Sequence, residues 1–272
     1  MSAPRALVFC RAGEKSLHGQ WIGDPATRSY DVWLDCYCDP AVWADAPAKV
    51  TDGRGTTKWP RVAALLADDP TAFDRYDVVW FPDDDLALDA ATVERFFGIF
   101  EAARLALAQP ALVDGCHWSH ELTLATHSFA LRYTNFVEVM APAFSREALR
   151  ACAPTFGRSK SGWGLDYAWP HVLGSPADAV AIVDATPMVH TRPVGGGYVM
   201  EEAGAEARAL SRQLGLPHPF VYRQFGGALR GREGGVGARV GPGLSFLARL
   251  AVGAPRSQRW RAHYWKVMCS TL

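Results

Sequence analysis

Three adjacent carboxylates, Asp83, Asp84 and Asp85, come just after the apolar segment 76–81. Adjacent carboxylates repel one another unless a cation or several hydrogen-bond donors neutralise them. In an extended chain, Asp83 and Asp85 point to one side and Asp84 to the other. Two carboxylates on one side can hold Mg²⁺ or Mn²⁺ and a diphosphate bound to it. A solvated acidic turn that caps the next helix is the alternative interpretation.

The segment Gly162-Trp163-Gly164-Leu165-Asp166 is the second motif whose residue types suit chemistry. Glycines on either side of an aromatic residue let the backbone approach a ligand closely. Trp163 would offer a flat apolar surface to a sugar ring, and Asp166, in the first turn of the following helix, would act as a general base. A turn with a packed tryptophan and a capping aspartate would give the same pattern.

His190 ends an apolar segment that starts at Val183, and Arg192 follows it. Imidazole combined with carboxylates suits Mn²⁺, which makes His190 a candidate third metal ligand. A lone histidine is more often a structural hydrogen-bonding residue. Lys58 and Arg192 would offset phosphate charge, or each would be an ordinary surface residue.

The elements that must position these residues follow from the apolar periodicity. Strands are predicted at residues 6–10, 30–36, 76–81, 111–113, 134–140 and 180–184. Helices are predicted at residues 58–67, 145–152 and 165–172, and after Asp89 through Leu107. Alternating strands and helices indicate an α/β domain. The acids then lie at the carboxyl end of a strand, where open α/β sheets bind their ligands.

Composition indicates a folded protein, because 49% of the 272 residues are hydrophobic. Lys and Arg total 28, as do Asp and Glu, so no global field attracts nucleic acid. No apolar segment approaches the roughly 18 residues of a membrane span, and residues 6–10 are shorter than a signal-peptide core of about 7 to 15. Six scattered cysteines without metal spacing predict buried thiols in a reducing cytoplasm.

Residues 201–272 differ from residues 1–200, and we expect them to form a basic, helical C-terminal extension. From Val221 onward the formal charge is +8. Helices are predicted at 201–214, 244–252 and 260–268, and the Gly- and Arg-rich segment 226–243 is predicted to be a flexible linker. The extension has three alternatives: contact with the inner face of an anionic membrane, packing on the domain or a partner subunit, and, least favoured, nucleic-acid binding.

Taken in this order, the motifs resemble the A-type nucleotide-sugar glycosyltransferases. Their Asp-x-Asp motif, matched by Asp83 to Asp85, binds Mn²⁺ and the donor diphosphate. Inverting galactosyltransferases of this type carry a Gly-Trp-Gly-x-Glu/Asp segment, which Gly162 to Asp166 resembles, and a later metal-binding histidine, which His190 resembles. In those relatives a second acid follows, whereas Tyr167 follows here; Glu138, His120 and Glu121 are therefore further candidates for the base.

A closer similarity is to domain-of-unknown-function family 707, over residues 5–195. The shared segments are YDVVWFPDDDL, QPAL, FVEVMAPAFSREAL, GWGLDYA and VDATPMVH. The set as a whole is specific, whereas each segment alone is weak. Together the two resemblances imply one mixed sheet flanked by helices.

The resemblance implies a metal-dependent glycosyltransferase. Asp85 and His190 would bind Mn²⁺ or Mg²⁺, with Asp83 on the metal or on the donor ribose, and Asp166 would deprotonate the acceptor. Asp84, Lys58, Trp163 and Arg192 would line the donor site. A UDP-sugar is the favoured donor, and the acceptor would be a saccharide or a lipid-linked glycan, as in surface polysaccharide synthesis. A non-catalytic carbohydrate- or nucleotide-binding module and a nucleotidyltransferase are the alternatives.

Overall fold

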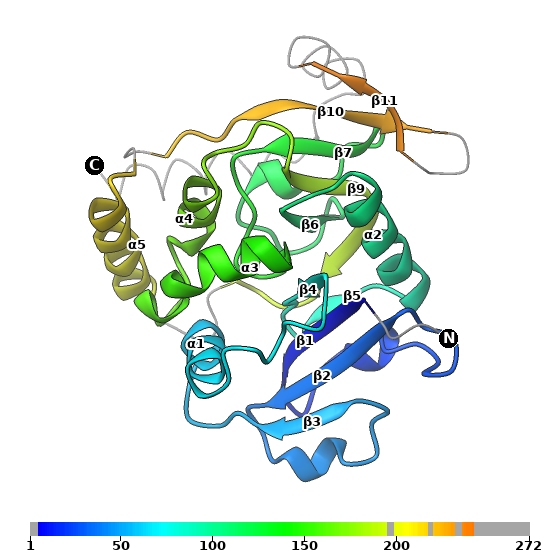
Figure 1. The fold of residues 1–272 in the computed structure, drawn as a ribbon, viewed down its shortest axis with the longest axis vertical. Coiled ribbons are helices and arrows are strands. Elements are labelled where there is room, and N and C mark those ends of the chain that lie inside the picture. The colour runs from blue at the N-terminus through cyan, green and yellow to red at the C-terminus, as the bar shows by residue number, and fades with distance from the viewer. Residues whose placement is uncertain (1–4, 195–198, 217–219, 232–235, 242–272) are drawn as a thin grey trace.

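The computed structural model describes residues 5–194, 199–216, 220–231 and 236–241 (Figure 1). The strands are β1 (Ala6–Ala12), β2 (Tyr30–Cys36), β3 (Lys49–Asp52), β4 (Val78–Trp80), β5 (Leu86–Ala87), β6 (Leu107–Leu112), β7 (Phe129–Thr134), β8 (Ala143–Ser145), β9 (Val180–His190), β10 (Gln224–Arg230) and β11 (Val236–Val240). The α-helices are α1 (Lys58–Asp68), α2 (Ala90–Ala102), α3 (Arg146–Cys152), α4 (Leu165–Val172) and α5 (Met200–Leu214). Among the described helices, none is both long and apolar enough to span a membrane.

The strands form one mixed sheet in the order β11-β10-β7-β9-β6-β8-β4-β1-β2-β3, and β5 pairs with β9 beside it. Strands β4, β1, β2 and β3 are mutually parallel. Strand β8 runs antiparallel between β4 and β6, and β6 is parallel to β9. The predicted α/β class with a mixed sheet is therefore confirmed.

Helices cover both faces of the sheet, which explains why its central strands are apolar on both sides. One core cluster joins Val8 of β1 to Phe96 and Phe100 of α2. The other joins Phe9 of β1 to residues of α1, α3 and α4, with Trp59 of α1 among them. Figure 1 accordingly shows α2 on the opposite side of the sheet from α1, α3 and α4.

The predicted starts of two helices are confirmed, and a capping side chain marks each of them. Asp89 accepts a hydrogen bond from the Thr92 amide at 2.7 Å and caps α2, and Ser145 caps α3 in the same way. The predicted extension of α2 to Leu107 is wrong. The helix ends at Ala102, Arg104 adopts a left-handed φ of 54°, and Leu107 is the first residue of β6.

The predicted strand at 134–140 is also wrong, because the sheet strand is β7 and it ends at Thr134. Beyond it the chain turns, and the Thr134 hydroxyl donates to the carbonyl of Phe136 at 2.8 Å. The amide of Glu138 then donates at 2.5 Å to Gln109 Oε1, a side chain of β6, instead of to a neighbouring strand. The apolar alternation here reflects a buried loop.

The predicted linker at 226–243 is wrong in its described part, because β10 and β11 add two strands to the sheet. Gly226 adopts a φ of 137°, and a Cβ on Gly227 would lie 2.5 Å from the carbonyl oxygen of Leu131 in β7. These glycines permit a close backbone approach between strands. The predicted helices at 244–252 and 260–268 lie outside the described residues.

A fully buried ion pair joins β7 to β9. Arg132 Nη2 lies 2.9 Å from Asp184 Oδ1, and neither side chain is exposed to solvent. The same guanidinium donates to the carbonyls of Leu122 and Leu124, and the Thr126 amide donates to Asp184 at 2.7 Å. The pair thus fixes the loop before β7 on the sheet.

Replacing Asp184 by Ala should lower the free energy of unfolding by about 3–5 kcal/mol, because it leaves the Arg132 charge buried without its partner. Urea unfolding measures this directly. Asp178→Ala is the matched control, since Asp178 is 69% exposed and lies 3.9 Å from Arg239; we expect a change within about 0.5 kcal/mol. Equal effects of the two substitutions would contradict the structural role of the pair.

Candidate functional site

Asp84, the middle acid of the triplet, is buried and connects three segments of the chain. Its carboxylate accepts hydrogen bonds from the Gly13 amide at 2.8 Å, after β1, and from the Tyr37 hydroxyl at 2.8 Å, after β2. Arg192, just after β9, donates to the other oxygen at 3.1 Å. Burial raises the pKa of Tyr37 most, and the negative charge of Asp84 raises it further. The phenol therefore stays protonated and donates its hydrogen bond. Asp84 therefore holds the loops that surround its two neighbours.

Asp83 forms an ion pair with Lys58, the first residue of α1. Lys58 Nζ lies 2.8 Å from Asp83 Oδ1 and also donates to the carbonyls of Val139 and Met140, at 3.1 and 3.0 Å. The Asp83 side chain is 42% exposed, so this carboxylate also faces solvent. Lys58 and Arg192, the two cations predicted to offset phosphate charge, thus both lie at the triplet, and each contacts a different acid.

Asp85 lies beside His190, as β5 pairs with the end of β9 and sets Leu86 opposite His190. Asp85 Oδ2 is 3.3 Å from His190 Nε2, and His190 Nδ1 is 3.1 Å from the carbonyl of His117. Burial alone would lower the pKa of His190, but the hydrogen bond and charge of Asp85 bring it above its ordinary value. Asp85 Oδ1 is buried and finds no hydrogen-bond partner among the described residues.

Glu138 lies in the loop that follows β7 and is 7% exposed. Its Oε2 is buried, and nothing in the described part of the chain hydrogen-bonds to it. Burial raises the pKa of Glu138 to about 7, while the positive charge of His190 lowers it and the charge of Asp83 raises it. This loop acid therefore interacts electrostatically with the acidic triplet and with His190.

Asp166 lies in the first turn of α4, as predicted, and is buried. Its Oδ1 accepts hydrogen bonds from the amides of Gly164 and Tyr167, at 3.2 and 3.0 Å. Burial is the main cause that raises the pKa of Asp166 to about 8, and the negative charge of Glu138 is the second. Glu138 thus couples the triplet to the second sequence motif.

The two glycines of that motif are required by the packing of the chain. Gly162 has a φ of 88°, and a Cβ there would lie 2.7 Å from Cδ1 of Trp59. Gly164 has a φ of 91°, and its Cβ would lie 2.9 Å from Cα of Ala207 in α5. Trp163 is half-buried between them, and its amide donates to Ser161 Oγ at 3.2 Å.

His120 and Glu121, the further candidates, lie before β7. His120 Nδ1 is 2.7 Å from the hydroxyl of Tyr222, and its ring lies 4.6 Å from that of Phe136. Burial lowers the pKa of His120 to about 4, so the imidazole is neutral. Glu121 begins a short 3-10 helix. His120 therefore belongs to an aromatic cluster.

Several residues that support the site from the sheet are not predicted from the sequence. Asp35, at the end of β2, is fully buried between Arg11 Nη1 at 2.7 Å and Arg61 Nη2 at 3.0 Å. Tyr37 and Gln109, which contact Asp84 and the Glu138 amide, were missed as well. A usable signal was the position of Asp35 and Tyr37 at and just after the carboxyl end of β2, a parallel neighbour of β1, since the carboxyl ends of such strands meet at one edge of the sheet.

The structure does not bring the three predicted metal ligands, Asp83, Asp85 and His190, together as a set. Within the described residues, no group of three His, Cys, Asp or Glu side chains is arranged to hold a metal ion. Asp85 and His190 are adjacent, whereas Asp83 is bound by Lys58. The buried Asp85 Oδ1 without a partner is the atom that best fits a cation.

Comparison with known proteins gives a family match and a fold. The model of the family described as protein of unknown function DUF707 matches residues 127–214, the segment that holds Glu138, Asp166 and His190. This match confirms the resemblance to that family over the segment. No curated protein matches the chain.

Solved structures of S. aureus TarS share the fold. The crystal structure of TarS 1-349 matches with a TM-score of 0.51 at 11% identity, over 76% of this chain and 64% of that chain. A longer TarS structure matches with a TM-score of 0.50 at 11% identity, over 77% of this chain and 39% of that chain. The chain therefore shares the α/β fold of TarS and spans less than two thirds of the length of these TarS chains.

Replacing Asp166 by Asn should make stability less dependent on pH. The folded protein holds this proton more tightly than the unfolded chain, because the pKa is raised from 3.8 to about 8. The stability that the proton supplies is complete below pH 3.8 and is lost as the pH rises towards about 8. Each pKa unit corresponds to about 1.4 kcal/mol. As the pH rises from 5 to 8, the free energy of unfolding of the variant should therefore increase by a few kcal/mol relative to that of the wild type.

Urea unfolding across that pH range measures the gain. Asp68→Asn, at the exposed end of α1, is the control and should follow the wild type. Parallel stability profiles for Asp166→Asn and the wild type would show that Asp166 ionises as an ordinary carboxylate.

Proposed function

We propose that this protein is a nucleotide-sugar-dependent glycosyltransferase whose donor site is built on Asp83, Asp85 and His190. The observation that carries the proposal is the buried Oδ1 of Asp85, which has no hydrogen-bond partner in the described chain. The other oxygen of the same carboxylate, Oδ2, lies 3.3 Å from His190 Nε2. A carboxylate and an imidazole together suit a divalent cation. They lie at the edge of the sheet where α/β folds bind ligands.

The residues present fit Mn²⁺ or Mg²⁺, with Asp85 and His190 as ligands and Asp83 on the cation or on the donor ribose. When bound, the cation would stabilise the departing nucleoside diphosphate as a Lewis acid. The carbonyl of His117 fixes the orientation of the His190 ring through Nδ1, which leaves Nε2 directed at Asp85. Asp84 is already saturated by donors and holds the loops.

Donor phosphates would be balanced by Lys58 and Arg192. Both cations already lie at the triplet, each bound to one carboxylate at 2.8 and 3.1 Å. Phosphate oxygens are a competing acceptor for the same donors. A UDP-sugar is the donor that we propose and a saccharide or glycan the acceptor, with Trp163 as the surface for a sugar ring.

Glu138 is the group that we propose as the general base, in place of Asp166. A base works best when its pKa lies near the working pH, and that of Glu138 is about 7. Its Oε2 is free of described partners and can accept the acceptor hydroxyl proton. Asp166, with a pKa of about 8, is mostly protonated at neutral pH and accepts two backbone hydrogen bonds that tie it to α4.

Thermal unfolding with UDP, GDP or CMP, each with and without Mn²⁺, tests the donor site. A nucleotide at 100 times its Kd stabilises by about 2.7 kcal/mol, which corresponds to roughly 5–10 °C for a chain of this size. We expect a shift with UDP that requires Mn²⁺ and is lost in Asp85→Asn. Asp45→Asn, an exposed acid outside the triplet, should keep it.

A shift that persists in Asp85→Asn would contradict the assignment of the cation to this site. A shift with no detectable sugar transfer to any saccharide would favour the non-catalytic binding module.

Glu138→Gln and Asp166→Asn distinguish the two acids. With the UDP-sugar that stabilises the protein, Glu138→Gln should lower transfer by about 10²–10⁴-fold, the usual contribution of a general base. The shift on binding UDP should remain, because Glu138 is not assigned to the donor. Asp166→Asn should lower transfer by less than about tenfold. The opposite order of effects, measured by UDP release, would return the base to Asp166.

A further inference from the structure

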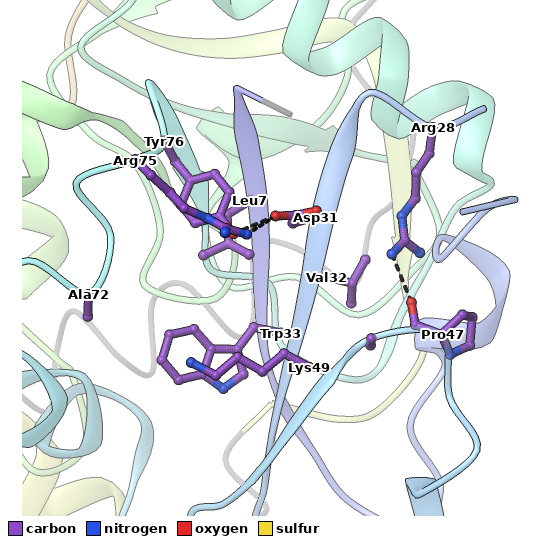
Figure 2. A pocket seen from close by; sticks show the side chains of 11 residues that line it. Leu7, Arg28, Asp31, Val32, Trp33, Pro47, Lys49, Ala72, Arg75 and Tyr76 are labelled. Carbon is purple, nitrogen blue, oxygen red and sulfur yellow. Dashed lines mark hydrogen bonds and ion pairs between the residues drawn. The ribbon is translucent and has the colours of Figure 1, made fainter. Parts of the chain in front are cut away.

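A cavity lies away from the acidic triplet, at the amino ends of β1 and β2 (Figure 2). It has a volume of about 410 Å³, within the range of small-molecule sites. Its lining includes Leu7 of β1, and Gly13, which contacts Asp84, lies six positions further along the chain. At about 3.3 Å per residue, the two sites are roughly 20 Å apart along the strand.

Three cations and one acid line this cavity, namely Arg28, Lys49, Arg75 and Asp31. Their formal charge is +2. Like charges gathered around one cavity repel one another, and a bound anion would relieve that repulsion. Asp31 is already engaged, since Arg75 and the hydroxyl of Tyr76 both donate to its Oδ2.

Two of the cations are positioned by neutral groups. Arg28 donates to the carbonyls of Ile22 and Pro47, both at 2.8 Å. Lys49 Nζ lies 3.3 Å from the centroid of the Trp33 ring. Figure 2 shows the two side chains against each other. Neither Arg28 nor Lys49 forms an ion pair with a carboxylate in the described chain, although the charge of Lys49 acts on Asp69. Neutral groups therefore hold both side chains in place, and no carboxylate among the described residues pairs with either positive charge.

The aromatic side chains of the cavity indicate which anion fits. Lys49 covers the ring of Trp33, and the Arg75 guanidinium lies 4.7 Å from the centroid of Tyr76. Trp33 and Tyr76 are otherwise buried. Their ring faces are occupied by cations, so the cavity offers positive charge to a ligand and no free ring surface on which a nucleobase would stack.

We propose that this cavity binds a phosphate or diphosphate group through Arg28, Lys49 and Arg75, independently of the donor site. Guanidinium groups bind phosphate oxygens in a bidentate geometry, and the ammonium of Lys49 adds a point charge. The ligand class is a small phosphate-bearing solute recognised by its phosphate and not by a base. This site does not rest on the proposed transferase activity.

Isothermal titration of the full chain with inorganic pyrophosphate, in EDTA and at physiological salt, tests the proposal. EDTA removes the cation on which the donor site depends. We expect saturable binding that Lys49→Met weakens at least tenfold, since methionine keeps an apolar side chain on Trp33 and removes the charge. Arg75→Met should have a similar effect. Arg158→Gln is the matched control, because this exposed arginine also donates to a carbonyl and lies outside the cavity.

Two comparisons separate this site from the donor site. Asp85→Asn should leave pyrophosphate binding in EDTA unchanged, and UDP should bind no more tightly than pyrophosphate. Unaltered affinity in Lys49→Met, with the variant folded as judged by its melting temperature, would overturn the proposal. Tighter binding of UDP would overturn it as well, because it would show that a nucleoside is recognised.

Discussion

The carboxylate of Asp84 accepts hydrogen bonds from segments that follow β1, β2 and β9, which are far apart in the sequence. An amide, a phenol and a guanidinium all donate to this one buried carboxylate. The acids on either side of it contact other residues. Asp83 meets Lys58 and Asp85 meets His190. An acidic triplet is stable here because each carboxylate has its own positive or polar neighbour, and the repulsion expected from the sequence is divided among three sets of partners.

The sheet explains how these partners meet. Strands β4, β1 and β2 are parallel neighbours, so their carboxyl ends bring the triplet and the loops after β1 and β2 to one edge. From the other half of the sheet, β9 delivers His190 and Arg192, and the loop after β7 delivers Glu138. The buried Asp35, bound by Arg11 and Arg61, ties α1 to β1 and β2 and thereby positions Lys58.

Much of this arrangement was predictable where one local pattern determines the structure. The apolar strand before Asp83, the cap at Asp89 and the helix that starts at Leu165 all depend on neighbouring residues in the chain. The loop that carries Glu138 was predicted as a strand, because burial of a loop on the core gives the same alternation as a sheet. Gly226 and Gly227 suggested a linker, whereas contact with a strand about a hundred residues earlier decides their role. Partners of Asp84 depend on tertiary contacts that no single segment encodes.

We propose above all that Asp85 and His190 form the cation site of a glycosyltransferase. Anomalous diffraction from crystals of the full chain grown with Mn²⁺ and UDP tests it most directly. We expect one strong manganese peak within coordination distance of the Asp85 carboxylate and His190 Nε2, with the UDP diphosphate next to it. Manganese found elsewhere, or UDP bound with no peak between Asp85 and His190, would contradict it.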